Sequence, residues 1–209
     1  MTGAIEQYIL DHIGEETPLL KELYLETHRR VMNPNMLSGH IQCRLLEMLV
    51  RMINPATVLE IGTYTGYSAI CIASAISKNS ILHTIERNDE LNEISSDFIS
   101  RSGLSGKIVQ HTGDARDIIA GIDSSFDLVF IDGDKREYTE YYEIVFDKIN
   151  HGGYIIADNV LWDGKVADEM EDDPMTEGIR RFNRRINTDP RVENSIIPIR
   201  DGIMLIRKL

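Results

Sequence analysis

FDLVFIDGDK, residues 126–135, and GGYIIADN, residues 152–159, are two apolar runs that each end in an acidic residue, with a helical pattern between them. Parallel strands that are buried on both faces read in this way. In an open parallel sheet, binding and catalytic residues gather at the carboxyl ends of the strands. We therefore expect the side chains at these two ends to converge in one crevice: Asp132, Lys135, Asp158 and Asn159.

These side chains would form an all-oxygen set with a lysine beside it. Asp132 and Asp158 supply carboxylates and Asn159 supplies an amide carbonyl, which suits a hard divalent cation, Mg²⁺ first, with Mn²⁺ or Ca²⁺ as alternatives. Either aspartate alone is equally well explained as the cap of the helix that follows, because Asp is a favoured N-cap residue. The joint pattern, with Lys135 one helical turn beyond Asp132, favours a metal site.

The flanking sequence continues the alternation of strands and helices. The apolar runs that read as strands are residues 57–61, 81–85, 107–110, 126–131 and 153–157. This order predicts an α/β fold with a mainly parallel sheet and helices on both faces. A helix over 176–187 then precedes two runs, 192–199 and 203–207, joined by Asp201-Gly202, a hairpin signal. An antiparallel C-terminal hairpin at one edge of the sheet is expected.

The first 54 residues read as helices placed before the first strand. They comprise a short amphipathic helix over Ala4–Ile13, a second helix that starts at Thr17-Pro18, and a third over about 38–53. This N-terminal helical addition (1–54) and the sheet region (55–209) are expected to form a single domain, because 209 residues fit one domain. The addition is expected to cover the carboxyl edge of the sheet or to form a subunit interface, as in a homodimer.

The composition restricts the classes of partner and the cellular location that are expected for the protein. The formal net charge of −12 disfavours broad electrostatic capture of nucleic acid or of an anionic membrane. No apolar run is long enough to span a bilayer, and Met1–Leu10 lacks the features of a signal peptide, so a cytoplasmic protein is expected. Cys43 and Cys71 read as small buried residues. One dense basic cluster reads as a solvated helix face: Arg180, Arg181, Arg184 and Arg185.

A glycine turn follows the first strand, in VLEIGTYTGYS, residues 58–68. Such a turn between a strand and a helix brings backbone N–H groups close to a ligand. Tyr64 stands where a dinucleotide-binding turn has its middle glycine, which disfavours a dehydrogenase. Glu86 ends the second strand, where an acidic residue commonly binds a ribose diol, and Asp114 after the third strand is placed to meet an adenine edge. Together these positions indicate a nucleoside cofactor without a pyrophosphate.

From Met36 onward the chain resembles the cation-dependent O-methyltransferases, the family of catechol and caffeoyl-coenzyme A O-methyltransferases. The segments that carry the resemblance, in the family's order, are VLEIGTYTGYSA, FDLVFIDGDKREY, GGYIIADNVLWDGKV, IRRFN and PIRDGI. It implies a Rossmann-like class I methyltransferase fold with S-adenosylmethionine (SAM) as the cofactor. By position, the implied cofactor-binding residues are Glu60, Gly62, Tyr64, Ser68, Glu86, Asp114, Ala115 and Asp132. Asp132, Asp158 and Asn159 match the metal ligands, and Lys135 matches the catalytic lysine.

The expected reaction is methyl transfer from SAM to a hydroxyl of a catechol or another vicinal-dihydroxy aromatic. A phenol with a pKa near 10 is mostly protonated at neutral pH, so a divalent cation is expected to stabilise the phenolate, and Lys135 to accept the proton. Met36, Lys135, Asn159 and Trp162 are candidate substrate contacts, although Met36 and Trp162 fit ordinary packing equally well. The alternative is a transfer RNA 5-hydroxyuridine O-methyltransferase with the same metal and cofactor site.

Overall fold

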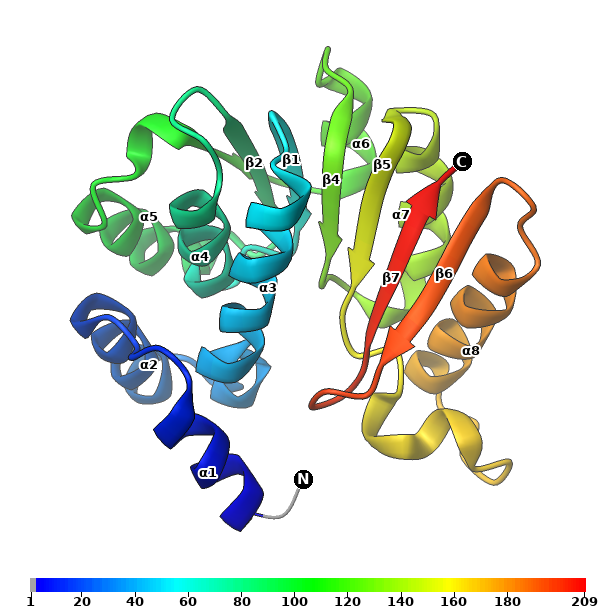
Figure 1. Ribbon diagram of the computed structural model, residues 1–209, viewed down its shortest axis with the longest axis horizontal. Coiled ribbons are helices and arrows are strands. Elements are labelled where there is room, and N and C mark those ends of the chain that lie inside the picture. The colour runs from blue at the N-terminus through cyan, green and yellow to red at the C-terminus, as the bar shows by residue number, and fades with distance from the viewer. Residues whose placement is uncertain (1–2) are drawn as a thin grey trace.

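Within residues 3–209, which the computed structural model describes, the chain forms a seven-stranded sheet of order β3-β2-β1-β4-β5-β7-β6 (Figure 1). Strands β1 to β5 pair in parallel, and β7 pairs antiparallel with both β5 and β6. The strands are β1 (Thr57–Ile61), β2 (Ile81–Glu86), β3 (Ile108–Thr112), β4 (Phe126–Ile131), β5 (Ile149–Ala157), β6 (Val192–Ile197) and β7 (Ile203–Lys208). The predicted α/β fold with an antiparallel C-terminal hairpin is confirmed.

Helices cover both faces of this sheet. The α-helices are α1 (Gly3–His12), α2 (Pro18–Arg30), α3 (Gly39–Ile53), α4 (Tyr67–Ala75), α5 (Asn92–Arg101), α6 (Ala115–Gly121), α7 (Tyr138–Phe146) and α8 (Pro174–Asn187). The short 3-10 helices are η1 (Pro34–Met36), η2 (Asp89–Leu91), η3 (Ser105–Lys107), η4 (Lys135–Glu137) and η5 (Trp162–Ala167). Apolar residues of α2 to α5 form one core with the sheet, and those of α6 to α8 form the other.

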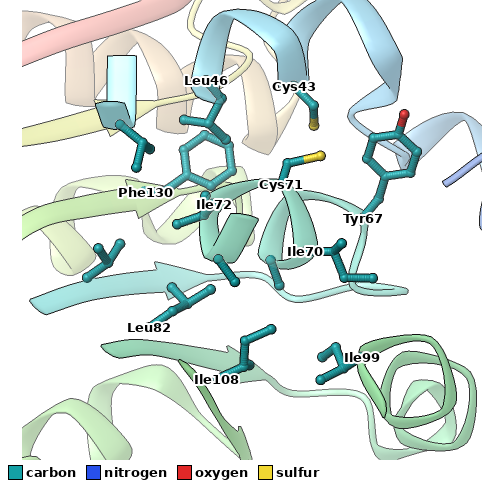
Figure 2. Close-up of a cluster of buried hydrophobic side chains, with 14 of the residues drawn as sticks. Cys43, Leu46, Tyr67, Ile70, Cys71, Ile72, Leu82, Ile99, Ile108 and Phe130 are labelled. Carbon is teal, nitrogen blue, oxygen red and sulfur yellow. The ribbon is translucent and has the colours of Figure 1, made fainter. Parts of the chain in front are cut away.

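The N-terminal helices begin where the sequence signals predict. Thr17 caps α2, because its side chain accepts a hydrogen bond from the Leu20 N–H, and Pro18 occupies the first helical position. Helix α3 packs against α4, and Figure 2 shows Cys43 of α3 beside Cys71 of α4 among apolar side chains. Both cysteines are free and buried, which confirms the prediction for them. Helix α1 buries none of its residues.

Two further predictions concern the start of one strand and the absence of a membrane-spanning segment. Strand β5 begins at Ile149, four residues before the predicted start, because polar Asn150 and His151 and the following glycines hid its first half. Among residues 3–209 no helix has the length and apolar character needed to cross a bilayer. The prediction about a signal peptide concerns Met1–Leu10. Residues 1 and 2 of that segment lie outside the described residues.

Candidate active site

One cavity of about 1100 Å³ lies at the carboxyl ends of β1, β2, β4 and β5. Each parallel strand ends there because strands that run the same way present the same end to one edge of the sheet. The expected convergence is observed, since four predicted side chains line this cavity: Asp132, Lys135, Asp158 and Asn159. Arg30, the last residue of α2, and the segment 31–38 that connects α2 to α3 line the same cavity, so this part of the N-terminal addition lies at the carboxyl edge of the sheet.

The two aspartates at the strand ends are held by different partners. Asp132 Oδ1 accepts a hydrogen bond from Lys135 Nζ at 2.7 Å. Asp158 Oδ1 accepts one from the Asn159 N–H at 2.8 Å, and its Oδ2 accepts one from Gln42 Nε2 at 2.5 Å. Burial, and next the nearby charge of Asp132, raise the pKa of the Asp158 carboxyl to about 7. Asp158 is therefore a desolvated carboxyl beside a second carboxylate.

This donor set fits a hard divalent cation. Two carboxylates and the Asn159 amide offer only oxygen ligands, the type that Mg²⁺, Mn²⁺ and Ca²⁺ prefer. Within residues 3–209 no three His, Cys, Asp or Glu side chains are grouped to hold a metal. A cation here would therefore depend on the amide oxygen of Asn159 as well as on the carboxylates.

Lys135 is fixed on two sides. Its side chain is 10% exposed, and its Nζ donates to Asp132 and, at 2.7 Å, to the hydroxyl of Tyr138. That hydroxyl in turn lies 3.1 Å from the carbonyl oxygen of Asp158, which accepts its hydrogen bond. Tyr138 is fully buried, and burial raises the pKa of its hydroxyl well above the ordinary value. This tyrosine, which links the lysine to the end of β5, was not predicted from the sequence.

The glycine turn after β1 is folded tightly against the end of β4. Gly62 has φ +103°, and a Cβ placed there would lie 2.8 Å from the carbonyl carbon of Asp132, so only glycine fits. The Tyr64 N–H donates to Glu86 Oε2 at 2.7 Å, and the Asn88 N–H donates to Glu86 Oε1 at 2.9 Å. Glu86 thus joins the turn after β1 to the turn after β2.

Not all of the predicted cofactor residues face the cavity. Those that line it are Gly62, Tyr64, Glu86, Ala115 and Asp132. Ser68 and Glu60 are buried and do not line it. Glu60 accepts a hydrogen bond from Thr84 Oγ1 at 2.5 Å, and its other oxygen has no partner among the described residues. Burial raises the pKa of Glu60 to about 8, which favours the protonated carboxyl at neutral pH.

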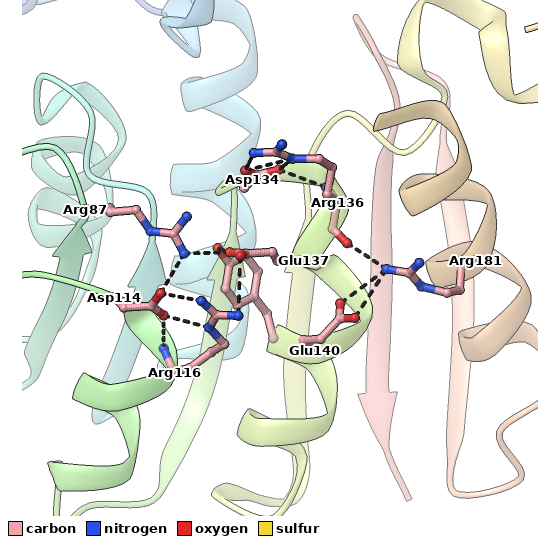
Figure 3. Close-up of polar contacts among 9 residues, drawn as sticks. Arg87, Asp114, Arg116, Asp134, Arg136, Glu137, Glu140 and Arg181 are labelled. Carbon is pink, nitrogen blue, oxygen red and sulfur yellow. Dashed lines mark hydrogen bonds and ion pairs between the residues drawn. The ribbon is translucent and has the colours of Figure 1, made fainter. Parts of the chain in front are cut away.

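Asp114 serves as a helix cap and as the centre of an ion-pair network (Figure 3). It caps α6 by accepting a hydrogen bond from the Arg116 N–H at 2.9 Å. Arg87 Nη2 donates to Asp114 at 2.8 Å and to Glu137 at 2.7 Å. The hydrogen bonds from Arg116 and the charge of Arg87 hold the pKa of the Asp114 carboxyl well below its usual range. Its neighbour Ala115 lines the cavity instead.

The other end of the cavity is formed by elements outside the parallel sheet. The candidate substrate contacts Met36 and Trp162 line it, and Arg200 and Asp201 from the β6–β7 turn join them. Asp201 Oδ2 accepts a hydrogen bond of 3.4 Å from the Asn159 amide. Sequence analysis used Asp201 only as a turn residue, although its place in PIRDGI was a usable signal.

The basic cluster on α8 differs from its prediction most strongly at Arg180, and Arg185 is also only 31% exposed and pairs with the buried Asp189. The Arg180 side chain is only 15% exposed. It donates to the carbonyl oxygens of Lys165, Val166 and Glu171 at 2.9, 3.1 and 2.7 Å. The prediction of a solvated helix face is therefore wrong for Arg180, which instead holds the segment after Trp162, whereas Arg184 is 68% exposed.

Comparison with known proteins identifies the family. A family model for O-methyltransferases matches residues 10–209. The chain belongs to the O-methyltransferase family. It is 33% identical to the catechol O-methyltransferase of Niastella koreensis, over 93% of this chain and 89% of that protein. It is 32% identical to a probable caffeoyl-CoA O-methyltransferase of Dictyostelium discoideum, over 99% of this chain and 92% of that protein.

A solved structure of this family supports both the fold and the cofactor. The O-methyltransferase TomG of Streptomyces achromogenes, in complex with SAM, superposes with a TM-score of 0.91 at 28% identity, over 98% of this chain and 96% of that one. The chain is thus a SAM-dependent O-methyltransferase of the caffeoyl-CoA and catechol type, with the class I fold that the sequence predicted.

Proposed function

We propose that the protein transfers the methyl group of SAM to a hydroxyl of a catechol or another vicinal-dihydroxy aromatic, in a reaction that requires Mg²⁺. The observation that carries the proposal is the meeting of Asp132, Asp158 and Asn159 with Lys135 in the cavity that the glycine turn also lines. The relative from Niastella koreensis, named as a catechol O-methyltransferase, supports this acceptor class.

The residues proposed to bind the cofactor lie at the ends of the strands and in the turns that follow them. Glu86 is proposed to bind the ribose diol, because its carboxylate ends β2 at the cavity. Gly62 and Tyr64 are assigned to the methionine end, with Ser68 and Glu60 buried beside the turn. Asp114 and Ala115 are assigned to the adenine, with Asp114 acting through the conformation of the α6 N-terminus that it caps.

The acceptor half holds the cation and the nucleophile. Asp132, Asp158 and Asn159 would bind Mg²⁺, with Mn²⁺ or Ca²⁺ as alternatives, and Asp132 also faces the cofactor. A bound divalent cation supplies positive charge that stabilises a phenolate and fixes its direction. Trp162 and Met36 are proposed to flank the aromatic ring, since both line the cavity. The remaining contribution of the site is orientation of two bound reactants.

Lys135 is proposed as the general base that takes the phenol's proton. Its Nζ lies within hydrogen-bond distance of both Asp132 and the Tyr138 hydroxyl. These two contacts keep the amine beside the metal ligand instead of letting it reach solvent. Tyr138 is a positioning residue here, because it ties Lys135 to the main chain of Asp158.

A cytoplasmic homodimer is proposed for the assembly. The support is α1, which carries apolar residues but buries none of them within this chain. Ile5 and Tyr8 on that helix are 53% and 64% exposed. Exposure of these large apolar side chains to water is unfavourable, and a partner subunit that covers them would explain it.

Methyl transfer from labelled SAM to a panel of catechols, and to hydroxylated and unmodified transfer RNA, tests the acceptor class. We expect transfer to catechols that stops in excess chelator and returns with Mg²⁺. Transfer RNA remains the alternative, but two arginines of the basic cluster on α8 are paired within the chain, Arg181 with Glu140 and Arg185 with Glu143. Transfer to hydroxylated transfer RNA alone, or full turnover without metal, would overturn the proposal.

A further inference from the structure

Residues with a left-handed backbone gather at the cavity. Among residues 3–209, those other than glycine with positive φ are Asn54, Tyr64, Asn159, Trp162, Asp163 and Arg200. Four of these six line the cavity, so unusual backbone conformations concentrate there. Arg200, at φ +47°, is the long charged member of the set. Such a conformation is uncommon for a side chain of this size, and it persists at functional sites where the side chain is needed.

The guanidinium of Arg200 has few partners. Its Nη1 and Nη2 lie 3.4 and 3.5 Å from the Leu37 carbonyl oxygen, which are long hydrogen bonds. Within residues 3–209 no carboxylate oxygen lies within 4.0 Å of it, whereas the other two arginines that line the cavity, Arg30 and Arg87, both pair with carboxylates. A guanidinium has five donors in a planar fork, so most of the donors of Arg200 are free for a ligand.

Arg200 lies at the acceptor end of the cavity. The next residue, Asp201, hydrogen-bonds to Asn159, and the carbonyl that Arg200 contacts belongs to Leu37, which follows Met36. The residues assigned to the ribose and adenine, Glu86 and Ala115, belong to β2 and to the start of α6. The methionine end of the cofactor, the other possible source of a carboxylate, is assigned to Gly62 and Tyr64 in the turn that follows β1. A ligand group bound by Arg200 is therefore assigned to the acceptor and not to the cofactor.

We propose that Arg200 determines acceptor specificity by binding a carboxylate on the aromatic acceptor. The inference rests on the proposed function and names its substrate class: a vicinal-dihydroxy aromatic acid. The diol would meet the metal ligands at one end of the ring, and the carboxylate would pair with the fork of the guanidinium at the other. Arginine suits this task because its planar donors match the two oxygens of a carboxylate.

A matched pair of acceptors tests the proposal: 3,4-dihydroxybenzoate and its methyl ester, which differ mainly in charge. The variant Arg200→Gly removes the guanidinium, and glycine readily adopts positive φ, so the turn should keep its conformation. We expect kcat/KM for the acid to fall about 10- to 100-fold, chiefly through KM, as for the loss of a charge-assisted hydrogen bond. The ester should change less than about 2-fold, and Arg200→Lys should restore part of the preference for the acid.

Calorimetric titration of both acceptors, with Mg²⁺ and S-adenosylhomocysteine present, gives a readout that needs no turnover. Wild type should bind the acid more tightly than the ester, and Arg200→Gly should lose that difference, while the exposed Arg184→Ala control keeps it. Equal binding and turnover of acid and ester in wild type, or an unaltered preference in Arg200→Gly, would overturn the role of Arg200. Failure of every catechol to accept a methyl group would instead overturn the proposed function.

Discussion

Gly178 offers a direct test of how Lys135 is held in place. It is a buried residue of α8, and α8 packs on η4, which begins with Lys135. A Cβ added at Gly178 would lie 2.8 Å from the Arg136 Cα and closer still to the Lys135 carbonyl oxygen. Both obstacles are main-chain atoms, so no side-chain rotation can relieve the contact. Gly178→Ala should therefore push η4 and α8 apart.

The expected magnitude combines two opposed effects. Alanine in place of glycine within a helix stabilises the protein by up to about 1 kcal/mol, and forced overpacking costs about 1–3 kcal/mol. Gly121, at the end of α6, has nothing within 4 Å of its added Cβ. Gly121→Ala thus carries the helix effect without the clash. We expect Gly178→Ala to be less stable than Gly121→Ala by about 1–3 kcal/mol.

Urea unfolding of wild type and both variants measures this difference, and single-turnover methyl transfer measures its effect on Lys135. A displacement approaching 1 Å at a catalytic group can cost about 100-fold in rate, so kcat should fall well below wild type while S-adenosylhomocysteine still binds. If Gly178→Ala were as stable as Gly121→Ala and fully active, the close packing of α8 on η4 would not control the position of Lys135.

Three further predictions address single carboxylates and the base. Glu60 has a pKa of about 8 against an ordinary 4.5, so its stabilising contribution is lost as pH rises from about 4.5 to 8. The stability of Glu60→Gln relative to wild type should therefore increase across that window, by a few kcal/mol. A relative stability that is equal at pH 5 and pH 8 in urea unfolding would contradict this. Glu86→Ala should weaken S-adenosylhomocysteine binding by about 1.5–3 kcal/mol in calorimetry, whereas unchanged affinity in the folded variant would place the ribose elsewhere. Lys135→Met should lower kcat by about 10²- to 10⁴-fold with little change in cofactor affinity, and near-wild-type kcat would exclude Lys135 as the base.

The strand-end part of the site was predictable because it depends on a local pattern and one topological rule. Asp132 and Asp158 each follow an apolar run directly, and the ends of parallel strands meet at one edge. The same pattern missed the first half of β5, because Asn150 and His151 interrupt the apolar run although both belong to the strand. A strand with exposed polar residues near its start carries no such signal.

The rest of the site could not be predicted because it depends on contacts between distant residues. Gln42 lies 116 residues before Asp158, to which it donates, and its sequence context shows only a polar residue in an amphipathic helix. Asp201 reaches Asn159 over 42 residues through the turn of the β6–β7 hairpin. The role of Tyr138 depends on where its hydroxyl points, which the sequence does not show. Tyr138, Tyr141 and Tyr142 all look like packing residues in the sequence, so nothing distinguishes Tyr138 from the other two.

Elements outside the parallel strands also maintain the unusual backbone at the cavity. The Tyr64 hydroxyl donates to the Asn33 carbonyl oxygen at 2.9 Å, which ties the left-handed Tyr64 to the segment before η1. Asn183 of α8 donates to the Val160 carbonyl oxygen at 2.9 Å, and Arg180 holds the segment that follows Trp162. Strained conformations persist only where surrounding contacts enforce them. The sheet therefore places the carboxylates, whereas the N-terminal segment, α8 and the hairpin turn determine the conformation of the residues proposed to contact the acceptor.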